Sequence, residues 1–323
     1  MTAIREPGKI NENTTLIDIG FFGVAGTGAV YLVEAGKSCL IDCGTPSEAF
    51  RIIKTLKKMK AFPPDYIALT HSHWDHSQGV SIFRKEALKE QRTITVLASE
   101  KAISLLEDQS FNKIFNPKKR FENIKDVSPL KEGDQIDLEG LTLDIIEVPG
   151  HSKDHIAFFD TKNKTLFVGD SIGLKFGGSG THLPPFMPPY WNKEDFYLSV
   201  EKLKQVDFEG ICLSHFGYIY NKEAKNLLVD VCSVTDQWWQ LFEKAEKEDK
   251  LDDTKYLTDL IMKETNLVIP DFKIEKFVMK FLLGLINSIR KIIRKDPLLP
   301  GHLLLPEVVG WFVSGYKIFK DLE

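Results

Sequence analysis

The spacing of apolar and polar positions divides the chain into two parts. Over the first 220 or so residues, short apolar runs of strand type alternate with loops and a few helices. Residues 30–35 and 39–42 predict a β-hairpin, and residues 45–60 predict a helix that begins at Thr45-Pro46. Most of the remaining strand candidates are apolar runs of four to six residues, as is typical of strands buried between layers: 65–70, 93–99, 141–149, 155–160, 165–170 and 210–214.

From about residue 221 the pattern becomes helical. The segments 221–248, 273–295 and 305–323 place apolar residues every three or four positions, which indicates amphipathic helices. We therefore expect an α/β catalytic core over residues 1–220 and a helical C-terminal extension, packed on that core, over residues 221–323.

The composition is that of an ordinary soluble globular protein, with 43% hydrophobic and 27% charged residues. A formal net charge of −4 gives no general reason to expect a nucleic-acid partner, and the basic runs NPKKRFENIKD and IRKIIRK are interpreted as solvated helix faces. The N-terminal residues contain no apolar signal segment, no apolar run is long enough to span a bilayer, and the four cysteines form no CxxC pair. These features predict a cytoplasmic protein with reduced cysteines and no membrane partner.

Three of the eight histidines fall within the six residues HSHWDH, 71–76, directly after the predicted strand 65–70. His71 and His73 leave an extended chain on the same side, and Asp75 and His76 follow where the chain must curl. Imidazole and carboxylate suit Zn²⁺, Fe²⁺ or Mn²⁺, and the lack of a nearby cysteine argues against a purely structural zinc site. The spacing therefore predicts two ligand pairs that face two neighbouring cations.

Three more loops place a ligand-type side chain after a predicted strand. His151 follows the strand 141–149, Asp170 follows the run TLFV, and His215 follows the run CLS. Ligands at the ends of different strands can converge on one site, and this recurrence carries more weight than any single residue.

The succession HxHxDH, GHS, GD and SH resembles the metallo-β-lactamase superfamily over residues 18–217. The resemblance implies an αβ/βα four-layer sandwich with a dinuclear metal centre at one edge. It further implies that one metal is bound by His71, His73 and His151, that the second is bound by Asp75, His76 and His215, and that Asp170 bridges them. Zinc is the first expectation for the two divalent ions, with iron and manganese as alternatives because the same ligands accept all three.

Other residues are expected around this centre. Asp42, in the run IDCG, and His155, in the pattern GHxxxH, resemble positions that support the ligand loops in that family. The glycine- and proline-rich segment 177–191 predicts a pocket wall or lid that carries His182, Phe186, Tyr190 and Trp191, a plain connection being the alternative. His302 is interpreted as a solitary polar side chain with no part in the site.

Two neighbouring cations lower the pKa of a water between them and polarise a carbonyl or phosphoryl oxygen. Together with Asp75, which would orient the nucleophile and take its proton, they predict hydrolysis of an ester-like bond by a metal-bridging hydroxide. The ligand loops are similar to those of glyoxalase II-like and lactonase-like members, which implies a small thioester, lactone or carboxylic ester as substrate. The alternatives are a phosphodiesterase or ribonuclease of the same fold, and a metal-binding regulatory protein that acts through a partner. The helical tail is left open as a pocket wall, a cover for the sheet, a homodimer face or a surface for an acyl chain.

Overall fold

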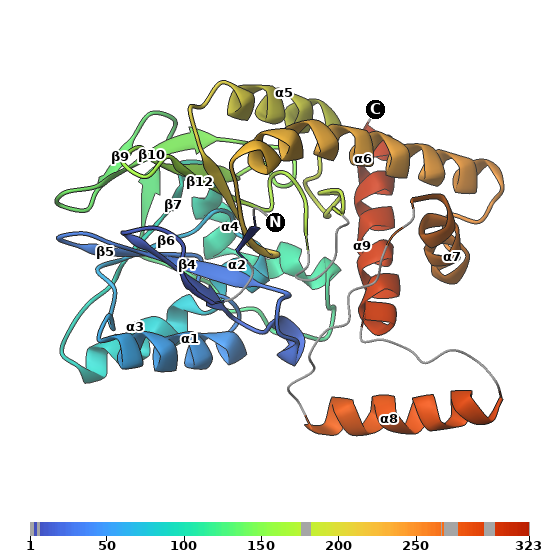
Figure 1. Cartoon of the computed structure of the whole chain (residues 1–323), viewed down its shortest axis with the longest axis horizontal. Coiled ribbons are helices and arrows are strands. Elements are labelled where there is room, and N and C mark those ends of the chain that lie inside the picture. The colour runs from blue at the N-terminus through green and yellow to red at the C-terminus, as the bar shows by residue number, and fades with distance from the viewer. Residues whose placement is uncertain are drawn as a thin grey trace.

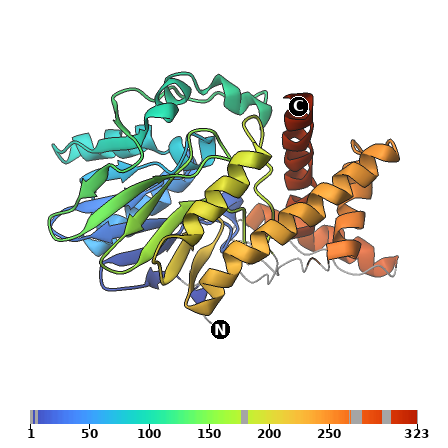
Figure 2. The same cartoon turned by 90° about the horizontal axis from the view of Figure 1, so that it is seen from above.

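The computed structural model of this chain describes residues 3–4, 7–175, 182–265, 267, 277–293 and 301–322. Two seven-stranded sheets face each other, with helices on both outer faces and a group of C-terminal helices at one end (Figures 1 and 2). The predicted four-layer sandwich with a helical C-terminal extension is confirmed.

The first sheet, called the N-terminal sheet, has the strand order β2-β3-β4-β5-β6-β7-β8. Strands β2 to β5 pair antiparallel, and β5 to β8 pair parallel. The strands are β2 (Gly8–Lys9), β3 (Thr14–Asp18), β4 (Ala29–Glu34), β5 (Ser38–Ile41), β6 (Tyr66–Ala68), β7 (Thr95–Ser99) and β8 (Val127–Leu130). The hairpin predicted from the sequence is β4 and β5.

The second sheet, called the C-terminal sheet, has the strand order β1-β14-β13-β12-β11-β10-β9, in which only β12 and β13 run parallel. Its strands are β1 (Ala3–Ile4), β9 (Gln135–Asp137), β10 (Thr142–Glu147), β11 (Ile156–Asp160), β12 (Thr165–Gly169), β13 (Gly210–Leu213) and β14 (Gly217–Tyr220). The phenol of Tyr31 on β4 donates a hydrogen bond to the carbonyl of Leu213 at 2.7 Å, which ties the two sheets together beside the loop that carries His215.

The outer faces carry helices of both sequence halves. Helices α1 and α3 cover the N-terminal sheet, and α5 and α6 cover the C-terminal sheet (Figure 1). The helices of the sandwich are α1 (Pro46–Met59), α2 (Trp74–Ser77), α3 (Val80–Lys89), α4 (Ile103–Glu107) and α5 (Lys193–Lys204), with short 3-10 turns at η1 (Phe21–Gly23), η2 (Glu100–Ala102) and η3 (Gln109–Ile114). The sequence pattern predicted α1 but did not single out α5.

Apolar side chains fill three layers, as strands covered on both faces require. On β4, Val30 and Leu32 pack toward α1 and α3, whereas Tyr31 and Val33 pack between the sheets. The third layer lies between the C-terminal sheet and the helices, where Val200 of α5 shares a cluster with side chains of α6, α7 and α9. Alternate residues of a strand point to opposite faces, so a continuous apolar run supplies two layers at once.

The extension consists of α6 (Lys222–Lys247), α7 (Thr254–Thr265), α8 (Phe277–Ile292) and α9 (Gly301–Leu322). Helix α6 begins directly after β14, and α7 packs against both α6 and α9. The pattern predicted α6, α8 and α9 but not α7. The functional division of the chain at residue 220 stays a prediction.

The expectations about cysteines and membrane spans can be compared with the structure. Cys39, Cys43 and Cys212 are buried, whereas Cys232 is only half-buried, and all four are free thiols. Among the helices that the structure describes, none is long and apolar enough to cross a membrane.

Candidate metal centre

The ligand loop HSHWDH leaves the end of β6 and is fixed against the loop that follows β5. The amide of Gly79 donates to the carbonyl of Gly44 at 2.7 Å, and the amide of Cys43 donates to the carbonyl of His76 at 3.0 Å. A Cβ atom on Gly79 would lie 2.2 Å from the Cys43 carbonyl oxygen. The φ of Gly79 is −68°, an ordinary helical value, so this position needs glycine because the two loops touch and not because the chain curls there.

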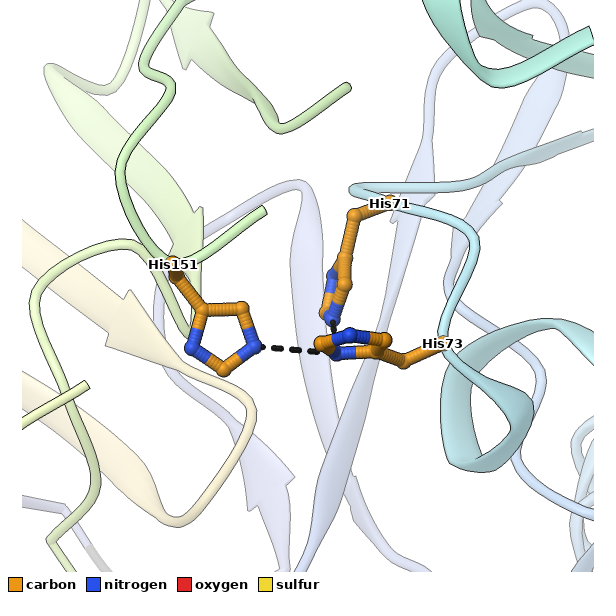
Figure 3. A group of neighbouring side chains, drawn as sticks. All are labelled: His71, His73 and His151. Carbon is orange, nitrogen blue, oxygen red and sulfur yellow. Dashed lines mark hydrogen bonds between the residues drawn. The ribbon is translucent and has the colours of Figure 1, made fainter. Parts of the chain in front are cut away.

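Three imidazoles from two loops point at one spot (Figure 3). Nε2 of His71 lies 2.9 Å from Nδ1 of His73, which in turn lies 3.1 Å from Nε2 of His151. All three side chains are at most 3% exposed. Nδ1 of His73 carries at most one proton, so it can donate to only one of the two neighbouring Nε2 atoms. At least one pair of ring nitrogens in this buried space therefore faces lone pair to lone pair.

A second group lies next to the first. Nε2 of His215 is 3.4 Å from Oδ2 of Asp75 and 3.5 Å from Oδ2 of Asp170. The same Asp170 oxygen lies 3.2 Å from Nε2 of His76 and 3.8 Å from Nε2 of His151. Asp170 is therefore placed between the group His71, His73 and His151 and the group Asp75, His76 and His215, and each group could hold a metal ion.

The remaining ring nitrogens of four histidines are held by acceptors that fix where the proton sits. Nδ1 of His151 donates to the carbonyl of Pro185 at 3.1 Å, and Nδ1 of His215 donates to the carbonyl of Thr27 at 2.7 Å. Carbonyl oxygens accept only, so the proton sits on Nδ1 and the free lone pair on Nε2 faces the cluster. The other two, His71 and His76, are held through Asp42.

Asp42 connects two of the four candidate ligand loops. Its carboxylate accepts from Nδ1 of His76 at 2.8 Å, from the amide and hydroxyl of Thr70, and from the hydroxyl of Ser214 at 3.1 Å. Because the Thr70 hydroxyl donates to Asp42, it accepts from Nδ1 of His71 at 3.0 Å. The φ of Asp42 is +61°, a left-handed value that a non-glycine residue adopts at an energetic cost, here offset by these hydrogen bonds. A carboxylate behind ligand histidines is the usual way to fix their tautomer and orientation.

His155 also lies behind the ligands and does not point into either group. Its ring stacks on His71 with centroids 4.6 Å apart, and its Nε2 accepts from the backbone amide of Asp170 at 3.1 Å. Burial lowers the pKa of His155 to about 3, so the ring is neutral and can accept. A Cβ on Gly169, where φ is +54°, would clash with this ring, which explains glycine before Asp170.

The charges of the two groups differ. Burial lowers the pKa of His71 well below its usual value, and the neighbouring imidazoles add to the effect. Burial opposes the charge of Asp75, yet His76 and His215 outweigh it and lower the pKa of Asp75 to about 2. Burial likewise opposes a charge on His76, but the carboxylates of Asp170 and Asp42 raise its pKa well above the usual value. Neutral imidazoles thus form one group, and ionised carboxylates with proton-attracting imidazoles form the other.

The donor set fits bound cations. Oδ1 of Asp170 is buried with no hydrogen-bond partner, and the facing ring nitrogens repel one another unless something positive lies between them. Imidazole nitrogen with carboxylate oxygen is the ligand chemistry of zinc, iron and manganese. The buried His/Asp clusters are consistent with a dinuclear metal site.

A cavity opens onto these ligands. His73, Asp75, His151, Asp170 and His215 form its polar side. The other side is apolar and is contributed by several elements: Phe21, Trp74, Phe115, Leu174, Met187, and Val308 and Trp311 of α9. The helical tail therefore forms part of the wall of this cavity.

The aromatic side chains predicted for the pocket are not among the residues that line this cavity. Phe186 and Trp191 are buried in the core with their ring centroids 4.9 Å apart, and the ring of Phe186 also packs against Phe312 of α9. Tyr190 is half-buried against Phe111, with the ammonium of Lys153 4.1 Å from its ring centroid. His182 is buried and hydrogen-bonds the carbonyl of Ile172. Residues 177–181 of the predicted segment, and the side chain of His302, lie outside the described residues.

Several contacts of the site were not predicted. The carbonyls of Thr27 and Pro185 carry no signal in a sequence, because any residue supplies a carbonyl. Thr70 could have been noticed, since a hydroxyl directly before the ligand run is well placed to reach both Asp42 and His71. Val308 and Trp311 could not, because they join the site only through the packing of α9.

Known proteins place this chain in a family. A sequence model of the Metallo-beta-lactamase superfamily matches residues 23–215. Hydroxyacylglutathione hydrolase 1 of Vibrio vulnificus (strain YJ016) is 30% identical over 209 residues, 61% of this chain and 68% of that protein. Acyl-coenzyme A thioesterase MBLAC2 of Gallus gallus is 30% identical over 149 residues, 44% of this chain and 51% of that protein.

The fold agrees. The crystal structure of MEM-A1, a subclass B3 metallo-beta-lactamase from a soil metagenome library, superposes with a TM-score of 0.55 at 16% identity and covers 73% of this chain and 96% of the other. Identity that low supports the fold alone. The family match extends over more than half of the chain and ends at His215, the last residue of the two clusters. The chain belongs to the metallo-β-lactamase superfamily.

Proposed function

We propose that this protein is a dinuclear metal-dependent hydrolase that cleaves thioesters with an apolar acyl group. The observation that carries the proposal is the convergence of seven ligand side chains on the polar side of a cavity whose other side is apolar. Two distant relatives, a hydroxyacylglutathione hydrolase and an acyl-coenzyme A thioesterase, are thioester hydrolases by name, which supports the choice of thioesters within the ester class.

Each group of side chains would hold one cation. His71, His73 and His151 would bind the first, and Asp75, His76 and His215 the second, with Asp170 between them. When bound, two such ions supply a nucleophilic hydroxide near neutral pH and polarise the scissile carbonyl. Zinc is our first choice, with iron and manganese as alternatives that the same ligands accept.

Asp75 is the ligand best placed to take part in proton transfer. Its side chain is 17% exposed, against 4% for Asp170, and it lines the cavity. With its pKa lowered to about 2 it is ionised at neutral pH and can only accept a proton or a hydrogen bond. We assign to Asp75 the orientation of the attacking water and the acceptance of its proton.

The cavity wall favours an acyl group over a phosphate. Among the described residues that line this cavity, none is Lys or Arg, the side chains that commonly bind phosphate groups. An apolar wall contributes about 25 cal/mol per Å² of substrate surface that it covers, so substrates with longer acyl chains should bind more tightly until the cavity is filled. A lactone or aryl ester presents the same carbonyl and is the nearest alternative substrate.

A substrate panel tests the proposal. Acyl thioesters of increasing chain length, acyl lactones, aryl esters, phosphodiesters and single-stranded RNA are assayed on protein loaded in turn with zinc, iron or manganese. We expect the highest kcat/KM for acyl thioesters. A preference for phosphodiester or RNA of about tenfold or more, which equals about 1.4 kcal/mol of transition-state stabilisation, would overturn the choice. No turnover of any member, together with a stable protein partner that the Asp75→Ala variant also binds, would favour a regulatory role.

A further inference from the structure

Helix α8 differs from the other long helices in what its apolar side chains contact. Seven large apolar side chains at its surface are exposed, from 36% for Ile286 to 80% for Ile292, and none belongs to the three apolar cores. They are Phe281, Leu282, Leu285, Ile286, Ile289, Ile292 and, just after the helix, Ile293. Figure 1 shows α8 lying apart from the sandwich and from α6, α7 and α9. Single exposed apolar side chains are ordinary on a soluble protein, but six on one helix and a seventh directly after it form an exposed apolar surface of the kind that marks an interaction site.

These side chains share one side of the helix. In a helix with 3.6 residues per turn, all seven positions fall within an arc of about 140° around the axis, with Phe281 at one edge and Ile286 at the other. Lys280 and Lys291, both exposed, project from the opposite side, with Asn287 between them. We call the apolar arc the α8 face.

The charge of this segment has one sign. Within α8 there are three Lys or Arg residues and no Asp or Glu, and Lys276, Arg294 and Lys295 adjoin it in the sequence. Two copies of α8 paired through this face would join two helices that carry Lys and Arg but no Asp or Glu, so pairing of the helix with itself gains no charge complementarity. A helix with an apolar arc on one side and basic residues on the other matches a lipid surface, whose interior is apolar and whose headgroups can be negatively charged.

We propose that α8 is a membrane-surface anchor that lies in the plane of an anionic lipid bilayer. The α8 face would enter the boundary between headgroups and acyl chains, while Lys280 and Lys291 stay among the phosphates. The helix has 16 residues and does not qualify as a membrane span, so the attachment is peripheral and reversible. This inference does not depend on the hydrolase activity, and it departs from the expectation, drawn from composition alone, of no membrane partner.

Vesicle sedimentation of the full chain tests the anchor. The probes are vesicles of phosphatidylcholine alone and vesicles of equal parts phosphatidylcholine and phosphatidylglycerol. The protein should sediment with the anionic vesicles at least about tenfold more strongly than with the neutral ones, and the bound fraction should fall as salt is raised. Hydrogen exchange of the α8 amides should slow on anionic vesicles, while exchange in α5 stays unchanged.

Three variants separate the two features of α8. The double variant Phe281→Ser/Ile289→Ser removes two side chains of the apolar arc, one at its edge and one near its middle. The double variant Lys280→Glu/Lys291→Glu reverses the charges. Each should lower the partition coefficient on anionic vesicles about tenfold or more. The matched control is Leu198→Ser/Val229→Ser, which removes apolar side chains of similar exposure, 70% and 61%, from α5 and α6. This control should bind vesicles like the parent protein.

Other outcomes would overturn the anchor. Equal binding to both kinds of vesicle, or none to either, excludes recognition of an anionic surface. If the parent forms a dimer without vesicles and Phe281→Ser/Ile289→Ser makes it monomeric, the α8 face is an interface between copies of this chain. If that variant unfolds at a markedly lower temperature than the Leu198→Ser/Val229→Ser control, the face packs on the body of its own chain.

Discussion

The two sides of the cavity are built differently. On the ligand side, four of the five histidines are held through their other ring nitrogen, as Asp42 holds His76 directly and His71 through Thr70. On the opposite side, α9 offers Val308 and Trp311, held only by packing, as where Trp311 meets Phe115 at 5.5 Å between ring centroids. Hydrogen bonds fix atoms to a fraction of an ångström, whereas apolar contacts tolerate exchange of one side chain for another of similar size. We expect the ligand side to decide whether the reaction occurs and the α9 side to decide which substrate is accepted.

Of the substitutions that test this contrast, removal of Asp75 should cause the largest loss of activity. Asp75→Ala deletes both a ligand of the second group and the proton acceptor in the cavity, so kcat should fall by about 10²- to 10⁴-fold. Metal analysis of the parent should give about two transition-metal ions per chain, and the variant should retain at least the ion held by the three-histidine group.

His302→Ala serves as the control for this loss, because it removes a histidine that is no member of the two groups. Its activity and metal content should match those of the parent. If His302→Ala is as damaging as Asp75→Ala, or if the parent binds one ion or none, the dinuclear assignment is wrong.

The same contrast explains what the sequence could and could not predict. The seven candidate ligands follow strands whose ends meet at one edge, and a strand end can be predicted from the local pattern, so the convergence of these side chains was predictable. The helical tail was one candidate for the wall, but its residues at the cavity were not predictable. Val308 lies more than 90 residues beyond His215 in the chain and reaches the cavity only through the packing of α6, α7 and α9. Within the predicted segment, Met187 lines the cavity while its neighbour Phe186 enters the core. Adjacent side chains of an extended segment point opposite ways, and the sequence does not tell which side is which.

Asp42→Asn should cause an intermediate loss of activity, because Asp42 contacts candidate ligands but does not line the cavity. The amide has one accepting oxygen in place of two, so it cannot serve the donors of Thr70, His76 and Ser214 together. Metal affinity, measured by titration against a competing chelator, should fall about 10- to 100-fold, and activity at saturating metal should recover in part.

The matched control for Asp42 is another buried aspartate that accepts hydrogen bonds away from the site. Asp160 is fully buried and accepts from the amides of Lys162 and Asn163 in the turn after β11. Asp160→Asn should lower the thermal stability without changing metal affinity. Equal losses of metal affinity in both variants would mean that Asp42 acts on the stability of the fold and not on the ligands.

Trp311→Ala should have the smallest effect and tests the α9 side alone. Loss of contact with roughly 50 Å² of a long acyl chain corresponds to about a tenfold rise in KM for that substrate, at about 25 cal/mol per Å². We expect thioesters with a short acyl group not to reach α9, so their KM should stay within about twofold of the parent value. Metal content should not change, because Trp311 is not a member of either ligand group. Leu322→Ala, on the same helix but 78% exposed, is the control and should leave both substrates unaffected. If Trp311→Ala raises KM equally for short and long acyl groups, or releases metal, then α9 supports the ligand side and the division of labour between the two sides of the cavity does not hold.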